Sequence, residues 1–205
     1  MKNSYCTIYL TRHGETSWNE KKLIQGQTDI PLNKKGELQA KQLGKRLKNI
    51  HFDAVFSSDL IRARRTAEIM ILEKKLTVVT TKALRERHFG QYEGKNFRKF
   101  DTELHRLLEE YKEITQEHKD SGLEVDEALI GRYIPFLREI SVAYAGKTVL
   151  IVTHGGVLRT FLIHLGFGSH DQLPSGCIDN LGYIKLDSDG VDFFIRETFG
   201  IRKNK

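Results

Sequence analysis

The sequence predicts an α/β fold, a three-layer α/β/α sandwich with a mostly parallel sheet and a terminal β-hairpin. Two observations lead to this class. Short runs rich in β-branched residues alternate with longer stretches whose apolar residues recur every three or four positions, which is the pattern of βαβ units. The final two runs, within residues 181–197, are instead separated by Asp189-Gly190, which is typical of a hairpin turn.

The predicted elements follow one another in chain order. β-Branched content predicts strands at residues 6–11, 54–58, 77–84 and 147–153, the last of them uninterrupted and therefore buried. Helical spacing of apolar residues predicts helices at residues 33–49, 60–73, 96–118, 126–146 and 157–165. Ser58 or Asp59 is expected to cap the second helix, and Pro135 to kink or break the fourth.

Length and composition narrow the setting. The 205 residues suit one domain, and 39% hydrophobic with 29% charged residues is typical of an ordinary folded protein. Neither a stretch of about 20 apolar residues nor a secretory signal is found, so we expect no membrane association and a cytoplasmic location. Cys6 and Cys177 are too few for a disulfide framework or a zinc site, and we interpret both as reduced thiols.

The net charge of +6, from 33 Lys and Arg against 27 Asp and Glu, allows either nucleic acid or a small anion as partner. The simpler interpretation is a solvated surface. Basic residues gather in the C-terminal "IRKNK" and in "NEKK" and "NKKG", without the interleaved aromatic residues that single-stranded nucleic acid binding uses. We therefore expect no nucleic acid partner.

Two predicted strands end in the same way. "YLTRHG" ends in His13-Gly14, and "LIVTHG" ends in His154-Gly155. In an open parallel sheet the carboxyl ends of the strands share one edge, where ligands bind. One histidine after a strand is more often structural, but two at the same edge indicate a shared site.

Further charged side chains follow strand ends. Arg12 directly precedes His13, Arg62 lies in the first turn of the helix after the second strand, and Glu86 follows the third strand. Arg64 and Arg65 are interpreted as a solvated helix face. Two arginines, two histidines and one carboxylate at one edge suit phosphoryl transfer, because fixed cations stabilise a phosphoryl group in flight.

The same set of residues offers a nucleophile and an acid. A neutral imidazole can attack phosphorus and hold the phosphoryl group, and nearby cations disfavour the imidazolium form of His13. A carboxylic acid can protonate the leaving oxygen and later take a proton from water.

Several blocks of the chain resemble the histidine phosphatase superfamily, the phosphoglycerate mutase-like proteins, in the same order along the sequence. The blocks are "LTRHGETSWN" (10–19), "IQGQTDIPLNKKGELQAKQLGKRL" (24–47), "SSDLIRARRTAEI" (57–69), "LRERHFGQYEG" (84–94) and "VTHGGVLR" (152–159). The resemblance implies a single domain over residues 1–205, with residues from about 95 to 125 as a helical lid or specificity insertion.

The resemblance also implies roles for individual residues. His13 would become phosphorylated, Arg12 and Arg62 would clamp the phosphate, and His154 would complete the phosphate pocket. Glu86 would be the proton donor. Neither a cofactor nor a metal ion is implied.

Other matches concern the substrate. Asn19 and Gln25 match positions that line the phosphate or substrate side, and His88 is a further polar candidate for which a surface role is an equal alternative. Where many small members carry Gly-Glu-Ser, this chain reads "SGLEVDEALIGR", with Leu123 between glycine and glutamate and no serine following. Substrate contacts from that segment are therefore in doubt.

The resemblance favours a phosphomonoesterase that hydrolyses small phosphorylated metabolites. Mutases similar to phosphoglycerate mutase usually carry an extended insertion after the acid-bearing loop, and this chain is short there. "ERHFGQYEGK" also resembles the mutase form of that block, so a cofactor-dependent phosphoglycerate mutase is the alternative. A metal-dependent hydrolase on His13, His154 and Glu86 and a catalytically inert binding module are two further classes, and a monomer and a homodimer both stay open.

Overall fold

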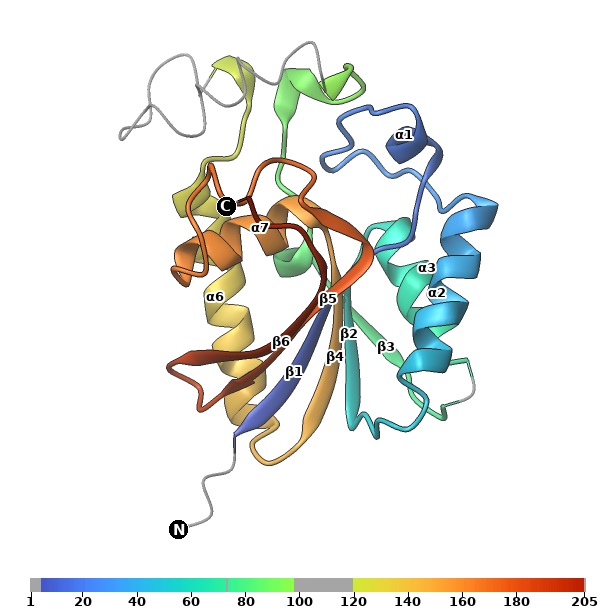
Figure 1. Cartoon of the computed structure of the whole chain (residues 1–205), viewed down its shortest axis with the longest axis vertical. Coiled ribbons are helices and arrows are strands. Elements are labelled where there is room, and N and C mark those ends of the chain that lie inside the picture. The colour runs from blue at the N-terminus through green and yellow to red at the C-terminus, as the bar shows by residue number, and fades with distance from the viewer. Residues whose placement is uncertain (1–4, 73, 98–119, 205) are drawn as a thin grey trace.

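The computed structural model describes residues 5–72, 74–97 and 120–204, and its helices cover both faces of one sheet (Figure 1). The strands of the described part are β1 (Cys6–Arg12), β2 (Ala54–Ser58), β3 (Val78–Thr81), β4 (Thr148–Thr153), β5 (Ile178–Ser188) and β6 (Phe193–Ile201). Its α-helices are α1 (Ser17–Glu20), α2 (Lys34–Arg46), α3 (Ile61–Met70), α6 (Asp126–Ala143) and α7 (Gly155–His164). Two 3₁₀ turns, η1 (Lys82–Leu84) and η2 (Gly90–Tyr92), follow β3.

The strand order is β3-β2-β4-β1-β5-β6. The first four strands in this order pair in parallel, β5 runs antiparallel to β1, and β6 runs antiparallel to β5. The mostly parallel sheet with a terminal hairpin is therefore confirmed. Because parallel strands point the same way, the carboxyl ends of β1, β2, β3 and β4 meet at one edge.

Two apolar clusters hold the layers together, one on each face of the sheet. Ile8 and Leu10 of β1 join the cluster under α6 and α7, whereas Tyr9 joins the cluster under α2 and α3. In β4, Val149 and Ile151 face the first cluster and Leu150 and Val152 the second. Successive strand residues point to opposite faces, so the apolar run of β4 is what a strand covered on both sides requires.

Two local expectations are corrected. The predicted break at Pro135 is wrong, since α6 runs continuously through this residue, which lies on the exposed side of the helix; the kink, the other form of that expectation, stays a prediction. Neither Ser58 nor Asp59 is the N-cap of α3. That position is held by Leu60, Asp29 accepts a 2.7 Å hydrogen bond from the N–H of Ile61, and Asp59 instead pairs with Arg85.

The third predicted strand is shorter than expected, since β3 gives way to η1 after Thr81. The predicted helix at 96–118 falls almost wholly on residues 98–119, which lie outside the described residues. None of the helices in the described part of the chain combines the length and the apolar character needed to cross a bilayer.

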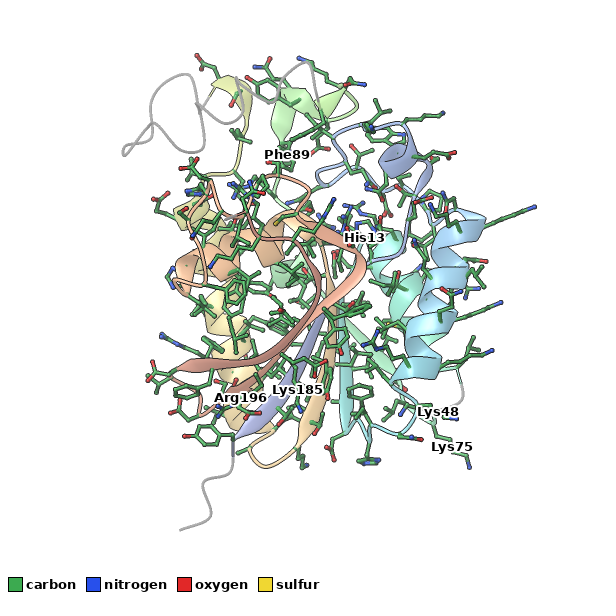
Figure 2. The ribbon with its side chains drawn as sticks, in the orientation of Figure 1. His13, Lys48, Lys75, Phe89, Lys185 and Arg196 are labelled. Carbon is green, nitrogen blue, oxygen red and sulfur yellow. The ribbon has the colours of Figure 1, made fainter. Side chains whose placement is uncertain are left out.

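Figure 2 shows His13 near the upper edge of the sheet, with Phe89 above it. The lysine and arginine side chains that it labels, Lys48, Lys75, Lys185 and Arg196, lie at the opposite end of the molecule. Part of the positive charge is thus far from the edge where the strand ends meet.

Candidate active site

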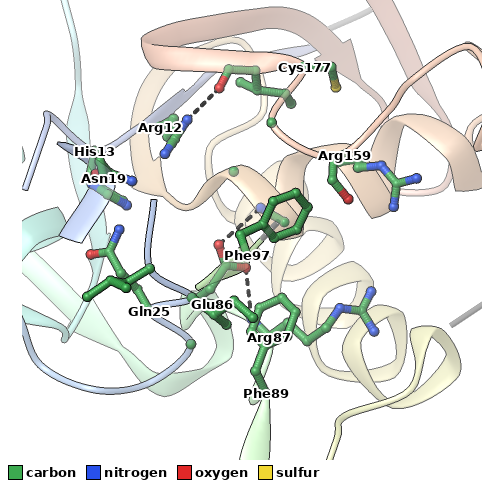
Figure 3. A pocket seen from close by; sticks show the side chains of 18 of the residues that line it. Arg12, His13, Asn19, Gln25, Glu86, Arg87, Phe89, Phe97, Arg159 and Cys177 are labelled. Atoms are coloured by element: carbon green, nitrogen blue, oxygen red, sulfur yellow. Dashed lines mark hydrogen bonds between the residues drawn. The ribbon is translucent and has the colours of Figure 1, made fainter. Parts of the chain in front are cut away.

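The ends of the parallel strands bring the predicted site residues together. His13 follows β1 directly, His154 follows β4 as the N-cap of α7, and Arg62 is the second residue of α3 after β2. Glu86 follows η1, the turn that continues β3. Together with Arg12, Asn19 and Gln25, the side chains of His13, Arg62 and Glu86 line one pocket of about 580 Å³ (Figure 3).

The ring of His13 is fixed in one tautomer. Its Nδ1 lies 2.7 Å from the carbonyl oxygen of Gly14. A carbonyl can only accept a hydrogen bond, so Nδ1 carries the proton and Nε2 keeps its lone pair. The backbone N–H of His13 donates to the Thr153 carbonyl at 3.0 Å, which anchors the residue to β4. His13 therefore offers Nε2 as a nucleophile.

The surroundings keep His13 neutral. The side chain is buried, and burial lowers its pKa well below 6.5, with the positive charges of Arg62 and Arg12 adding to the effect. The hydrogen bond to Gly14 acts in the opposite direction but is the smaller influence. This agrees with the expectation from the neighbouring arginines.

Backbone carbonyls orient the two arginines. Arg12 donates from Nη1 to Ile178 at 2.6 Å, and Arg62 donates from Nη1 to Thr28 at 2.8 Å and from Nη2 to Gly26 at 2.6 Å. Burial lowers the pKa of both guanidinium groups, that of Arg62 to about 10, so Arg62 stays charged at neutral pH. Bonds to carbonyls fix the orientation of both groups and leave their positive charge unneutralised.

His154 lies against His13 and is fully buried. The two rings meet edge to face, with centroids 5.2 Å apart. Burial, Arg62 and His13 lower the pKa of His154 well below 6.5. His154 is not among the residues that line the pocket, so its ring stands behind that of His13.

Four buried nitrogen atoms around His13 have no hydrogen-bond partner in the described part of the chain: Nε of Arg12, Nε of Arg62 and both ring nitrogens of His154. Buried polar atoms in folded proteins are nearly always paired, and unpaired ones call for an explanation. The two guanidinium N–H groups belong to arginines that line the pocket, so an anion such as phosphate bound there would satisfy them.

Backbone N–H groups hold the carboxylate of Glu86. Its Oε1 accepts from Arg87 at 2.8 Å and from Val157 at 3.1 Å, and its Oε2 accepts from Gly156 at 3.0 Å. Gly156 and Val157 belong to the first turn of α7, where free N–H groups attract negative charge. A carboxylate has about four acceptor positions, so Oε2 keeps one for a further partner.

The glycines after the two histidines have a packing role. A Cβ atom on Gly14 would lie 2.5 Å from the carbonyl oxygen of Gly36 in α2, and one on Gly156 would lie 2.6 Å from Oε1 of Glu86. These two glycines therefore let α2 and Glu86 come close to the strand ends.

Asn19 and Gln25 share one partner. Thr16 donates from its backbone N–H and its hydroxyl to Oδ1 of Asn19, both at 3.1 Å, and that hydroxyl also lies 3.0 Å from Oε1 of Gln25. With their oxygens engaged, the amide nitrogens of both side chains are the ends that can donate to an anion. His88, in contrast, is half exposed, lies outside the pocket lining and bonds to Gly122 at 2.7 Å.

The outer side of the pocket was not predicted. It includes Leu23, Phe89, Phe97, Arg159 and Arg202, which come from two separate loops, from the end of the described range 74–97, from α7 and from the C-terminal end. Phe97 belongs to the periodic pattern of the predicted helix at 96–118, but no such pattern singles out Leu23, Phe89 or Arg202 in the sequence. Figure 3 shows Phe97 and Phe89 beside Glu86.

The altered Gly-Glu-Ser-like segment contributes a brace for the Glu86 loop. Glu124 accepts two hydrogen bonds from Arg132, at 2.7 and 2.9 Å, and one from the N–H of His88 at 3.1 Å. Arg132 in turn donates to the carbonyls of Ala83 and Glu86. This pairing was also missed, because nothing in the spacing of Glu124 and Arg132 points to Glu86.

No group of three or more His, Cys, Asp or Glu side chains within residues 5–72, 74–97 and 120–204 is arranged to hold a metal ion. His13, His154 and Glu86 therefore do not form the ligand set that a metal-dependent hydrolase would need. Cys6 and Cys177 are both buried and unpaired with each other.

The family model described as histidine phosphatase superfamily (branch 1) matches residues 8–199. The chain belongs to this superfamily. A phosphatase of Bacillus subtilis named PhoE, itself uncharacterized, is 34% identical over 180 residues, which cover 86% of this chain and 88% of the relative. Phosphoglycerate mutase-like protein 4 of Arabidopsis thaliana is 38% identical over 163 residues, or 76% of this chain and 69% of the relative.

A solved structure agrees with the family. The crystal structure of a phosphoglycerate mutase from Bacillus anthracis matches with a TM-score of 0.82 over 97% of this chain and 94% of that chain, at 26% identity. The phosphoglycerate mutase-like fold is thereby confirmed. The family is that of the histidine phosphatases, and the matched proteins are named as a phosphatase, a phosphoglycerate mutase-like protein and a phosphoglycerate mutase, so the chain is an enzyme of phosphoryl transfer.

Proposed function

We propose that this histidine phosphatase superfamily member hydrolyses small phosphomonoesters through a phosphohistidine at His13. The observation that carries the proposal is the state of His13: a neutral, buried ring whose Nδ1 is bonded to Gly14, leaving the Nε2 lone pair beside two buried arginines. A nucleophile with a free lone pair next to unneutralised cations suits attack on an anionic phosphate.

In the first half-reaction, Nε2 of His13 forms a bond to phosphorus while the bond from phosphorus to the ester oxygen breaks. Arg12 and Arg62 stabilise the charge on the three equatorial oxygens, while His154 packs against the ring of the nucleophile. Glu86 enters this step as the carboxylic acid and gives its proton to the leaving oxygen, so that the product is a neutral alcohol and Glu86 is left as the carboxylate.

In the second half-reaction, a water molecule attacks phosphorus and the bond from phosphorus to Nε2 breaks. Glu86, now a carboxylate, takes the proton of the water, most directly at Oε2, which accepts one backbone hydrogen bond whereas Oε1 accepts two. Inorganic phosphate leaves, and His13 and Glu86 return to their starting states. Asn19 and Gln25 donate to phosphate oxygens throughout.

Rapid quench after mixing the enzyme with radiolabelled phenyl phosphate tests the proposal. We expect an acid-labile protein phosphate that is absent in His13→Ala and present in His164→Ala, a control histidine that lies exposed at the end of α7. Free phosphate should be the main product, and vanadate should inhibit because it imitates the trigonal phosphoryl group. A His13→Ala variant that still becomes labelled would contradict the proposal.

Phosphoglycerate mutase is the second candidate, favoured by the solved structure with that name and by the mutase-like relative. The same experiment separates the two, because a mutase returns the phosphoryl group to phosphoglycerate rather than to water. Loss of activity with a chelator and its recovery with added metal would contradict both the phosphatase and the mutase and would favour a metal-dependent hydrolase.

A further inference from the structure

The strand β5 contains a bulge beside the nucleophile. Ile178 pairs with Ile201 of β6 and Tyr183 pairs with Phe199, so five residue steps of β5 stand opposite two of β6. Within the bulge, Leu181 has a φ of 60°, in the left-handed region that non-glycine residues rarely adopt. Strained bulges of this kind gather next to active sites, where they aim a side chain.

Close backbone packing keeps the bulge in this shape. A Cβ atom on Gly182 would lie 2.9 Å from the carbonyl oxygen of Gly200 in β6, so only glycine fits there. The carbonyl of Gly182 accepts a 3.1 Å hydrogen bond from the hydroxyl of Thr11, which ties the bulge to the end of β1.

The bulge also contacts the next two residues of the chain, Arg12 at the end of β1 and His13 after it. The carbonyl of Ile178 accepts from Nη1 of Arg12 at 2.6 Å, and Nδ2 of Asn180 donates to the carbonyl of His13 at 3.0 Å. The same Nδ2 lies 3.5 Å from Oδ1 of Asn19. One amide group is thus placed between the nucleophile and a residue that donates to phosphate.

We propose that Asn180 is a positioning residue for the reaction, which holds the backbone of His13 and the amide of Asn19 in the geometry that phosphorylation needs. This inference rests on the function proposed above and adds to it a residue on the antiparallel side of the sheet. Asn180 does not line the pocket, so it acts through His13 and Asn19 and not on the substrate.

The chemistry explains why an amide is required. Both groups that Nδ2 faces, the His13 carbonyl and Oδ1 of Asn19, are hydrogen-bond acceptors. An aspartate has the same shape but only acceptor oxygens when ionised, so it would repel both groups. Packing alone would tolerate Asn180→Asp, whereas a donor role would not.

A matched control exists on the same strand pair. At the other end of β5, Asp187 accepts a 2.8 Å hydrogen bond from the hydroxyl of Thr7 in β1 and another from Arg196. Asp187→Ala therefore removes side-chain bonds between β5 and β1 without touching the bulge. Any general weakening of this strand pair should appear in both variants, and loss of positioning only in the Asn180 variants.

The experiment is single-turnover rapid quench with radiolabelled phenyl phosphate, which measures the rate of phosphohistidine formation and the fraction of sites labelled. In Asn180→Ala we expect the rate to fall about 10-fold with full labelling, since small misplacement of reacting groups has large kinetic effects. Asn180→Asp should be at least as slow, and Asp187→Ala should keep the wild-type rate. Thermal unfolding of all three reports their stability.

A purely structural role for Asn180 would lower the labelled fraction and leave the rate of the folded molecules unchanged. That result, a wild-type rate in Asn180→Asp, or failure of both Asn180 variants to fold would overturn the inference. Absence of phosphohistidine in the wild-type enzyme would instead contradict the proposed function, so the two failures are distinguishable.

Discussion

The phosphate-binding side of the pocket is formed by Arg12, His13 and Arg62, with His154 packed behind His13, and it differs from the outer side in how its residues are held. Each of the four lies at a strand end or in the helix that follows, and hydrogen bonds to backbone groups hold Arg12, His13 and Arg62. The outer side, which consists of Leu23, Phe89, Phe97, Arg159 and Arg202, is assembled from segments far apart in the chain.

This difference corresponds to a division of the reaction. In a double displacement, every substrate passes its phosphoryl group to the same histidine, and the second half-reaction is independent of the alcohol that left. The phosphate-binding side would therefore act in both half-reactions. The outer side would touch only the leaving group and would affect only the first.

Removing one of the two arginines of the phosphate-binding side should have the largest effect on catalysis. We expect Arg62→Ala to lower kcat/KM by about 10²- to 10³-fold for every ester, because a fixed charge on the transition state is lost. Arg64→Ala is the control, since Arg64 lies two residues further along α3, is half exposed and pairs with Glu68. Steady-state kinetics with two unrelated esters checks this, and an effect confined to one ester would contradict it.

Displacing the acid should have the next largest effect. A Cβ atom on Gly156 would lie 2.6 Å from Oε1 of Glu86, so Gly156→Ala must move the carboxylate from its backbone donors. We expect kcat to fall about 10- to 100-fold, most strongly for esters with poor leaving groups, which need the proton most.

The matched glycine for this test is Gly131 in α6, where a Cβ atom would meet nothing within 4 Å. Gly131→Ala should leave kcat unchanged and raise the free energy of unfolding by about 0.5–1 kcal/mol, because alanine is the better helix former. Equal kcat values for Gly156→Ala and the wild-type enzyme would contradict the role of Glu86 as the proton donor.

The two sides also differ in how far the sequence predicts them. Periodicity predicted the sheet and its hairpin, and the strand ends predicted that His13, Arg62, Glu86 and His154 would meet, because topology forces parallel strand ends together. The strand ends did not predict that His154 lies behind His13, since ring packing depends on side chains from the whole core.

The missed elements depend on contacts between distant segments. Asn180 reaches His13 only through the strained bulge of β5, and Glu124 reaches Glu86 only through Arg132. The prediction of the N-cap of α3 was wrong for the same reason, because the side chain that accepts from the N–H of Ile61 is Asp29, which lies in a distant loop. Local propensity carries no information about such partners.

The outer side can be tested separately by shortening its aromatic residues. We expect Phe97→Ala and Phe89→Ala to change the rate of His13 phosphorylation by about 10-fold for some esters and little for others, because only the leaving group loses a contact. Dephosphorylation should keep its wild-type rate. Phe194→Ala, on β6 and 38% exposed, is the control. Slower dephosphorylation in Phe97→Ala would show that the two sides are not independent.

The smallest expected effect is a pH dependence of stability that originates on the phosphate-binding side. Burial lowers the pKa of His13 and His154 well below the 6.5 of the unfolded chain, so the unfolded chain binds more protons as the pH falls. The stability that their neutral forms contribute is complete above pH 6.5 and is lost progressively below it. We expect the melting temperature to fall by a few degrees between pH 7 and pH 5, at about 2–4 °C per kcal/mol.

The double variant His13→Gln, His154→Gln should flatten this slope, whereas His164→Gln, on the exposed end of α7, should not. An unchanged slope in the double variant would mean that other groups cause the pH dependence.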